Sequence, residues 1–460
     1  MRSKGSFEGV PLRSTLVVLV GALFILGPAL VNGFPFVYPD TGTYLASAFR
    51  GYVPIDRPYW YGVFMRLTSL GGNTFWGIVM GQALLCSLYI FRTVSLFSVR
   101  HSHVTTLLVI LTLSVFSSLG WYAGQLMPDI FTGIGILAIY HLLLGNGRRW
   151  VRIADGVMAI SCCWVHLSNL LILPMSGAVL ILVHRRQLAG NFRRIWFAIA
   201  GFTLIAWAGL AIANRIVDRE FYISRGGHVF LVAHMVDTGM LKAWLDDHCA
   251  EGTHRICAYK DRLPEDSGHF LWADSISPMH LEGGWLATRS EYDHIIRSTL
   301  TEPRYLAWHA GSSFSSLIEE LTCWTICVGL ENDEYRTPRS PPYVMIEGTI
   351  KSALDDYLGS LQNGGRGELS LRWPDRIYAA FTIMSFLLAV LFLYWLRADS
   401  GVDRALRGAL LYAIGSVLIG CWVCASLAVV DDRYLARISW LVPMFVMIVA
   451  ARRFSAPSHT

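Results

Sequence analysis

Three acidic motifs lie at the ends of apolar stretches, where a charged side chain is expensive unless it serves a purpose. Asp40 lies in a turn just after the first apolar stretch, Asp129 lies at the start of another, and Asp431 and Asp432 precede the last one. Aromatic residues surround Asp40, and partial desolvation of its carboxyl would raise its proton affinity and suit it to general base catalysis. The order of the apolar stretches predicts that all three motifs face one side of a membrane.

Each of these acids also has a purely structural explanation. Asp40 lies in a Pro-Asp-Thr-Gly segment, which is typical of a turn and could cap a short helix. Asp129 would be stabilised by the dipole at a helix N-terminus. Asp431 and Asp432 could belong to a surface loop of paired charges. The residues alone leave both explanations open for each acid.

Basic side chains lie near the same predicted membrane surface. Arg433 and Arg437 are one helical turn apart, and such a pair of guanidinium groups can hold a lipid phosphate. His166 lies at the outer end of a short helical pair. It is either a packed, partly buried histidine or the base of an acyltransferase, for which its own span offers no partner acid.

The elements that must position these residues are membrane helices. The chain of 460 residues is 54% hydrophobic and 15% charged, a composition that excludes an ordinary soluble protein. Because about ten apolar stretches are long enough to cross a bilayer as helix, we expect an all-α polytopic membrane protein. These stretches are 14–32, 74–97, 104–122, 128–145, 153–169, 170–184, 195–217, 377–397, 407–429 and 437–451.

Basic residues in the short loops set the expected orientation. They gather in alternate loops, so both termini are expected in the cytoplasm, with the acidic motifs outside. The absence of any Asn-x-Ser/Thr sequon fits a bacterial inner membrane. Topology also explains the net charge of +5, so no nucleic-acid partner is expected. The basic residues are Arg2, Lys4, Arg13, Arg100, Arg148, Arg149, Arg152, Arg185, Arg186, Arg193, Arg194, Arg397, Arg404, Arg407, Arg452 and Arg453.

The chain divides into three expected parts. Residues 1–217 form an N-terminal transmembrane module with a first outer loop at 33–73, and residues 376–460 form a C-terminal transmembrane module. Residues 218–375 are expected to fold as a mixed, mainly helical extracytoplasmic domain, in which 303–329 reads as an amphipathic helix that could lie along the membrane interface. Cys249 and Cys257, eight residues apart in this domain, are expected to form a disulfide.

Several common catalytic motifs are missing. The chain has no P-loop, no dinucleotide-binding glycine motif, no nucleophile elbow and no zinc-protease motif. The predicted spans carry almost no charge, which argues against ion-coupled transport. Glu319-Glu320 and 331–334 could bind a divalent cation, but neither has a recognisable ligand spacing, so no metal ligand and no certain cofactor is assigned.

The acidic motifs and the architecture together resemble the GT-C superfamily of integral-membrane glycosyltransferases. These enzymes use polyprenyl-phosphate-linked sugars and include protein O-mannosyltransferases and lipid A aminoarabinose transferases. The resemblance is carried by three short motifs and by the arrangement of 12–217 and 377–451. Two features depart from the family: Gly42 stands where many members have a second acid, and the outer domain is inserted before the last spans. The motifs are Tyr38-Pro39-Asp40-Thr41, Met127-Pro128-Asp129 and Asp431-Asp432-Arg433-Tyr434.

The resemblance implies an inverting transfer of a sugar to an envelope glycan, lipid or protein. Asp40 would accept the proton of the attacking acceptor, and Asp129 would orient the acceptor or an arginine. The leaving polyprenyl phosphate would be held by Arg57, Arg433 and Arg437. The remaining expected residues would form a substrate groove beside membrane lipids; they are Tyr38, Tyr44, Trp60, Tyr61, His166, Asp431 and Asp432.

Two other classes of protein fit the same span count. A transporter or flippase of envelope lipids or glycans should have a polar cavity through the bilayer. An assembly protein of the envelope would need no catalytic acid, so Asp40→Asn would leave its function intact.

Overall fold

All regular elements of the described chain are helices, which confirms the all-helical class. The computed structural model describes residues 12–97, 99, 101–186, 188, 190, 192–251, 254–331, 333–396 and 400–454. Within these ranges the one isolated bridge joins Phe36 to Gln125. Four of the basic residues that set the expected orientation lie outside the description; they are Arg2, Lys4, Arg100 and Arg397.

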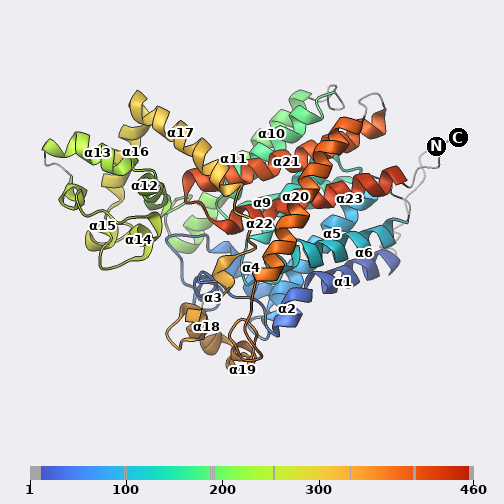
Figure 1. Cartoon of the computed structure of the whole chain (residues 1–460), viewed down its shortest axis with the longest axis horizontal. Helices are drawn as coiled ribbons and strands as arrows, with labels where there is room; N and C mark the ends of the chain where they lie inside the picture. The colour runs from blue at the N-terminus through green and yellow to red at the C-terminus, as the bar shows by residue number, and fades with distance from the viewer. Residues whose placement is uncertain are drawn as a thin grey trace.

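A bundle of apolar helices forms the larger part of the molecule (Figure 1). In the described chain, five helical segments are long and apolar enough to cross a membrane: α5 (Trp76–Leu96), α11 (Phe192–Asp218), α20 (Arg372–Trp395), α21 (Gly401–Leu427) and the continuous pair α22 (Asp432–Ser439) and α23 (Leu441–Phe454). Shorter helices complete the bundle; they are α1 (Leu12–Ile25), α6 (Ser102–Phe116), α8 (Ile130–Leu144), α9 (Arg149–Val165) and α10 (Asn169–Val183). The length and composition of these helices are consistent with a membrane protein.

Two of the ten predicted stretches are broken by a local backbone feature. The stretch 14–32 divides at Leu26 into α1 and the short α2 (Gly27–Asn32), which has Pro28 in its first turn. The stretch 104–122 divides at Ser117, whose extended backbone (φ −122°, ψ 179°) ends α6 before α7 (Leu119–Ala123). Apolar composition alone did not reveal these breaks.

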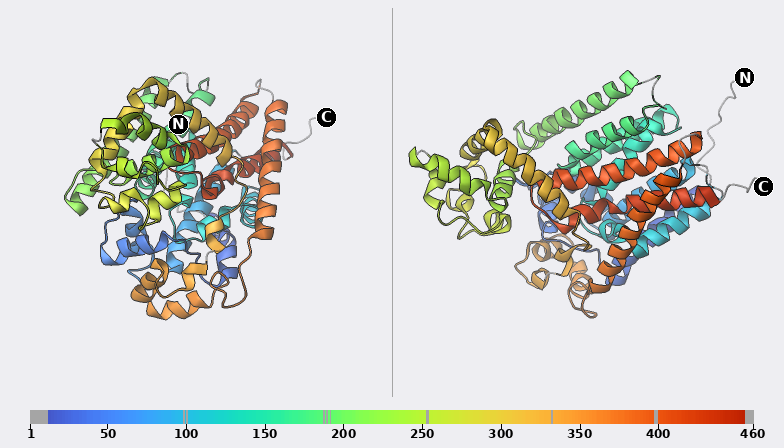
Figure 2. Two further views of the ribbon diagram at one scale, coloured as in Figure 1. Left: turned by 60° about the vertical axis from the view of Figure 1, so that its left-hand side comes forward. Right: turned by 45° about the horizontal axis from the view of Figure 1, so that its top comes forward.

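The first half of 218–375 forms a small helical unit at one end of the bundle, here called the distal unit. Figure 2 shows it joined to the bundle by α17, which runs back towards α21. Its own hydrophobic core includes Val229, Trp244, Phe270 and Tyr292, and the predicted disulfide between Cys249 and Cys257 is present. Its helices are α12 (Gly227–Asp237), α13 (Met240–His248), α14 (Ser267–Trp272), α15 (Pro278–Leu281), α16 (Arg289–Thr301) and α17 (Pro303–Glu320).

The second half of 218–375 belongs to the core of the bundle and not to the distal unit. Its helices α18 (Pro341–Thr349) and α19 (Leu354–Leu358) lie beside the first outer loop, which contains α3 (Thr41–Arg50) and α4 (Trp60–Thr68). Gly42 of α3 lies so close to Pro341 that a Cβ there would be 2.5 Å from the Pro341 backbone. The segment expected as one domain is therefore divided between two cores, because apolar residues such as Ile346 and Tyr357 pack into the bundle.

Candidate functional site

Three elements bring the predicted acids and arginines together at one end of the bundle. Asp40 immediately precedes α3, Asp129 immediately precedes α8, and Arg433 and Arg437 lie on α22. This end is opposite to the one at which α1 begins and α23 ends (Figure 1). Asp40 and Arg433 are 393 residues apart in the chain, yet their side chains are in contact.

The Asp40 carboxylate lies between two guanidinium groups. Arg57 Nη1 is 2.8 Å from Asp40 Oδ1, a charge contact rather than an aligned hydrogen bond. Arg433 Nη1 is 3.3 Å from Asp40 Oδ2. Each arginine also has a second acid, since Asp56 lies 2.5 Å from Arg57 Nη2 and Asp431 lies 3.4 Å from Arg433 Nε. With 21% of its side chain exposed, Asp40 can still meet a molecule from outside.

The expected rise in the proton affinity of Asp40 is wrong for this arrangement. Burial does raise the pKa of the Asp40 carboxyl, but the positive charges of Arg57 and Arg433 outweigh burial and hold the pKa below its ordinary value. The side chain also makes no hydrogen bond that caps α3. Asp40 is therefore an ionised carboxylate held by two arginines.

Asp129 forms the deeper of the two acid–arginine pairs. Arg437 Nη1 is 3.1 Å from Asp129 Oδ1, and the two side chains are 0% and 2% exposed. Arg437 Nη2 donates to Ser168 Oγ at 3.2 Å and to Cys424 Sγ at 3.0 Å. The Asp129 side chain does not cap α8. Its carboxylate therefore pairs with Arg437. Each charge stabilises the other, because both are removed from water.

His166 completes the surroundings of Arg437, and its tautomer follows from its neighbours. Arg437 Nη1 is 2.9 Å from His166 Nε2, and this nitrogen must accept because a guanidinium group can only donate. The ring proton is then on Nδ1, which donates to Ser168 Oγ at 2.9 Å. Asp129 lies 3.9 Å from His166 Nε2, so α8 supplies an acid that the histidine's own span lacks. Arg437 nevertheless occupies the lone pair that a base would need, and His166 does not activate Ser168 here.

Two acidic side chains hold the N-terminal end of α22. The Asp431 side chain caps the helix by accepting a hydrogen bond from the Arg433 amide at 3.1 Å. Glu320, fully buried at the end of α17, accepts from the amides of Asp431 at 3.1 Å and Leu435 at 2.8 Å. These contacts satisfy backbone donors that a helix start leaves free. They fix the helix from which Arg433 and Arg437 project.

The predicted groove residues divide into two groups, and the first lies against the arginines. The guanidinium carbon of Arg433 is 5.0 Å from the centre of the Tyr38 ring, and that of Arg57 is 5.4 Å from the Tyr44 ring. Such contacts stabilise a cation over an aromatic face. Tyr61 lies beneath Tyr44, with ring centres 5.0 Å apart, and is fully buried.

The second group holds neighbouring segments in place. Trp60 Nε1 donates to Asn214 Oδ1 of α11 at 3.3 Å. Asp432 Oδ2 accepts from Thr325 Oγ1 at 2.8 Å and from the Val328 amide at 2.7 Å. The expected substrate groove thus contains side chains that are already committed to protein contacts.

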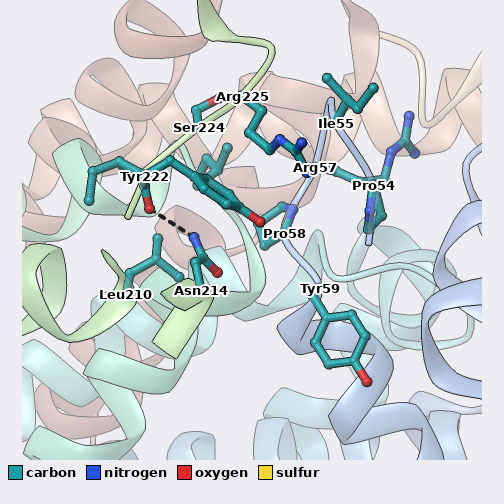
Figure 3. Close-up of a pocket in the computed structure, with 12 residues that line it drawn as sticks. Pro54, Ile55, Arg57, Pro58, Tyr59, Leu210, Asn214, Tyr222, Ser224 and Arg225 are labelled. Carbon is teal, nitrogen blue, oxygen red and sulfur yellow. Dashed lines mark hydrogen bonds between the residues drawn. The ribbon is translucent and has the colours of Figure 1, made fainter. Parts of the chain in front are cut away.

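A small hollow lies beside Arg57, one of the two arginines that contact Asp40 (Figure 3). Arg57 lines it from the first outer loop, facing Asn214 and the segment that carries Tyr222 and Arg225. Asn214 Nδ2 donates to the Tyr222 carbonyl at 2.9 Å across this segment. The accessible volume is about 10 Å³, which is room for about one water molecule. A sugar or a phosphate fits only if the first outer loop or the 222–225 segment moves.

Comparison with known proteins adds no assignment. No protein-family model, no curated protein and no solved structure matches this chain. The function must therefore be argued from the residues and their geometry.

One ion pair between a buried acid and a partly exposed arginine lies away from Asp40 and its arginines. Asp155 of α9 is 1% exposed and binds Arg92 of α5 through both oxygens, at 2.5 and 2.8 Å. Tyr89 Oη donates to the same carboxylate at 2.9 Å. Both charges lie near the edges of predicted stretches, Asp155 at the start of 153–169 and Arg92 near the end of 74–97.

The described residues contain no group of three or more histidine, cysteine, aspartate or glutamate side chains that could hold a metal ion. Of the acids considered for a cation, Glu320 caps α22, and Glu331 accepts from a backbone amide at 2.6 Å. Asn332 and the side chains of Asp333 and Glu334 lie outside the description.

Three residues of the site were missed by sequence reasoning. Glu320 was considered together with Glu319 only as a cation ligand, whereas it accepts two amide hydrogen bonds at the start of α22. Ser168 lies two residues from His166, and that proximity was the available signal. Gln362 holds the first outer loop by accepting from the Val37 amide at 3.0 Å and donating to the Val37 carbonyl at 2.8 Å. Nothing local in the sequence indicates this last contact.

Proposed function

We propose that this protein is an inverting membrane glycosyltransferase. It would move a sugar from a polyprenyl-phosphate donor to a glycan, lipid or protein of the cell envelope. The observation that carries this proposal is the partly exposed Asp40 carboxylate between Arg57 and Arg433 at the end of a bundle of apolar helices. A lipid phosphate needs cations at the membrane surface, and an acceptor hydroxyl needs a base beside them.

The chemistry proposed for this site balances as a single displacement. The acceptor oxygen attacks the anomeric carbon, the bond from that carbon to the phosphate oxygen breaks, and polyprenyl phosphate leaves with the electron pair. Arg57 and Arg433 would bind the phosphate, so less of their charge would act on Asp40 and its proton affinity would rise. Asp40 would then take the proton of the acceptor. Arg437 would stay paired with Asp129 and hold α22, which carries Arg433, in position.

The proposal includes the finer topology. Each of the ten predicted stretches contains a helix, and five segments are long and apolar enough to cross alone. We place ten spans in a bacterial inner membrane, with both termini in the cytoplasm and 218–375 on the periplasmic side. Helices such as α1 and α8 would then cross with the help of the short helices or loops that continue them.

The test is mass spectrometry of envelope lipids, polysaccharides and surface proteins. Cells would carry the wild type, a deletion, Asp40→Asn or the matched control Asp261→Asn, whose side chain is 89% exposed. Loss of one sugar increment in the deletion and in Asp40→Asn, but not in the control, supports the transferase. Loss in the deletion alone, with normal amounts of Asp40→Asn protein, rejects catalysis through Asp40.

The ion pair between Arg92 and Asp155 favours a second candidate, a transporter or flippase of envelope lipids or glycans. Buried charges among membrane helices are often part of a translocation path. In that case cells with Asp155→Asn would lose the sugar increment, whereas cells with Asp40→Asn would keep it. The opposite pattern favours the transferase.

A further inference from the structure

Helix α17 exposes three large apolar side chains. Leu306, Phe314 and Ile318 are 50%, 66% and 49% exposed. The side of the helix that faces the protein is mixed, since Trp308 and Leu317 pack half-buried against the two cores while serines and Glu320 are buried beside them. Its buried residues are Tyr305, Ser312, Ser316 and Glu320.

The exposed apolar residues of α17 lie on one face. Phe314 and Ile318 are four residues apart, and Ala310 and Leu306 continue the same stripe towards the N-terminus. In water this arrangement would place the apolar stripe on the costly side of the helix. Apolar residues on the outside are expected where the surroundings are lipid.

A membrane helix beside α17 also exposes apolar side chains. The helix packs against α21, whose exposed residues near the same end include Leu418, Trp422 and Leu427, at 39%, 39% and 44% exposed. Figure 2 shows α17 leaving the distal unit and reaching the end of α21. Both helices of this packed pair therefore carry exposed apolar side chains.

The N-terminal end of α17 lies among charged and exposed side chains. Arg304 Nη1 lies 2.6 Å from Asp247 Oδ2, and Tyr305 Oη donates to the same oxygen at 2.5 Å. Arg304 is 63% exposed. The helix thus begins among charged groups of the distal unit and ends beside the bundle, as a helix that enters a membrane surface obliquely would.

We propose that α17 docks on the lipid surface, with Phe314 and Ile318 in the boundary between headgroups and acyl chains. Its inner face then has a second role, because Glu320 holds the amides of Asp431 and Leu435 at the start of α22. Lipid on one side of α17 and Glu320 on the other together fix the helix that carries Arg433 and Arg437. This inference requires a membrane protein but does not require glycosyl transfer.

The experiment places a fluorescent label on each side of α17. Phe314→Cys and the matched control Glu319→Cys, which is exposed on the polar margin of the same helix, are made in a Cys323→Ser background. The other free cysteines of the described chain are buried. The full-length protein is labelled with bimane and placed in phosphatidylethanolamine–phosphatidylglycerol vesicles that contain doxyl-labelled lipid.

Docking predicts that doxyl lipid quenches about half or more of the bimane fluorescence at position 314 and little at 319. It also predicts that a water-soluble methanethiosulfonate reacts about tenfold more slowly at position 314. Equal reaction rates without quenching would show that the face meets water. An unreactive and unquenched position 314 would show that protein, such as a second copy of this chain, covers it. Either of these results overturns the proposal.

Discussion

Arg437 Nη1 lies 3.1 Å from Asp129 Oδ1, and neither side chain is more than 2% exposed. The pair ties α22 to the start of α8, whereas the contact of Arg433 with Asp40 ties α22 to the first outer loop. One eight-residue helix therefore holds two loops that are distant in the chain. Its two arginines differ in exposure, so they should differ in what their removal affects.

Arg437→Gln should lower the free energy of unfolding by about 3–5 kcal/mol, because it leaves the Asp129 charge buried and unpaired. The measurement is chemical unfolding in detergent micelles. Arg453→Gln serves as the control, since Arg453 pairs with Asp403 at an exposed site and should cost at most about 1 kcal/mol. The double variant Asp129→Asn/Arg437→Gln should lose less than the sum of the single variants. Additive losses would show that the two charges do not interact.

Acid should destabilise the wild type through Asp40 more than it destabilises Asp40→Asn. The pKa of Asp40 is held below its ordinary value of 3.8, so the folded state binds this proton less readily than the unfolded state. The stabilisation is complete above that ordinary pKa and is lost as the pH falls through the folded pKa. The melting temperatures of the wild type and of Asp40→Asn, measured between pH 7 and pH 3, should therefore approach each other at the acid end. Parallel curves would contradict the contacts with Arg57 and Arg433.

The raised pKa of Glu320 predicts the opposite dependence of stability on pH. Burial raises its pKa to about 8 from an ordinary 4.5, although the two amide hydrogen bonds lower it. The folded state therefore keeps a proton that the unfolded state loses, and stability should fall as the pH rises from 4.5 to about 8. The slope should be at most about 1.4 kcal/mol per pH unit. Glu320→Gln should flatten this part of the curve, and an unchanged slope would exclude Glu320 as its source.

The disulfide should stabilise the distal unit specifically. Cys249 and Cys257 close a short loop, for which chain entropy predicts about 2–3 kcal/mol. Cys249→Ser/Cys257→Ser should therefore increase the rate of limited proteolysis within 227–301, and Cys323→Ser should leave it unchanged. If the bundle were cleaved faster as well, the distal unit would not fold around its own core.

The parts of the fold that follow from periodicity and composition were predictable from the sequence. The apolar stretches indicate helices because a chain in hydrocarbon must satisfy its backbone internally, and the eight-residue spacing of Cys249 and Cys257 indicates a disulfide. The breaks at Leu26 and Ser117 were not predictable from hydropathy. Pro28 follows the first break, and the short helices beyond the two breaks, α2 and α7, pack against each other.

The residues that gather at the site were predictable from the sequence, but the contacts between individual acids and arginines were not. Asp40, Asp129, Arg433 and Arg437 were all recognised, because charges beside apolar stretches are conspicuous. Which arginine binds which acid depends on the rotation of α22, and that rotation is set by Glu320 from a segment more than a hundred residues earlier. The sign of the pKa shift of Asp40 was missed for the same reason, since burial was foreseen and the two arginines around the carboxylate were not.

The two hydrogen bonds between the Gln362 side chain and the Val37 backbone have a consequence for biosynthesis. The two residues are separated by 325 positions, and Arg433 lies further still from Asp40. Contacts of such long range form only after the intervening chain has been made and inserted. A ribosome-bound chain that ends before 362 would contain Asp40 and Arg57 but would lack both Gln362 and Arg433. The site therefore assembles only late in synthesis, so a truncated product should have no activity even if its first seven helices of the bundle are in place.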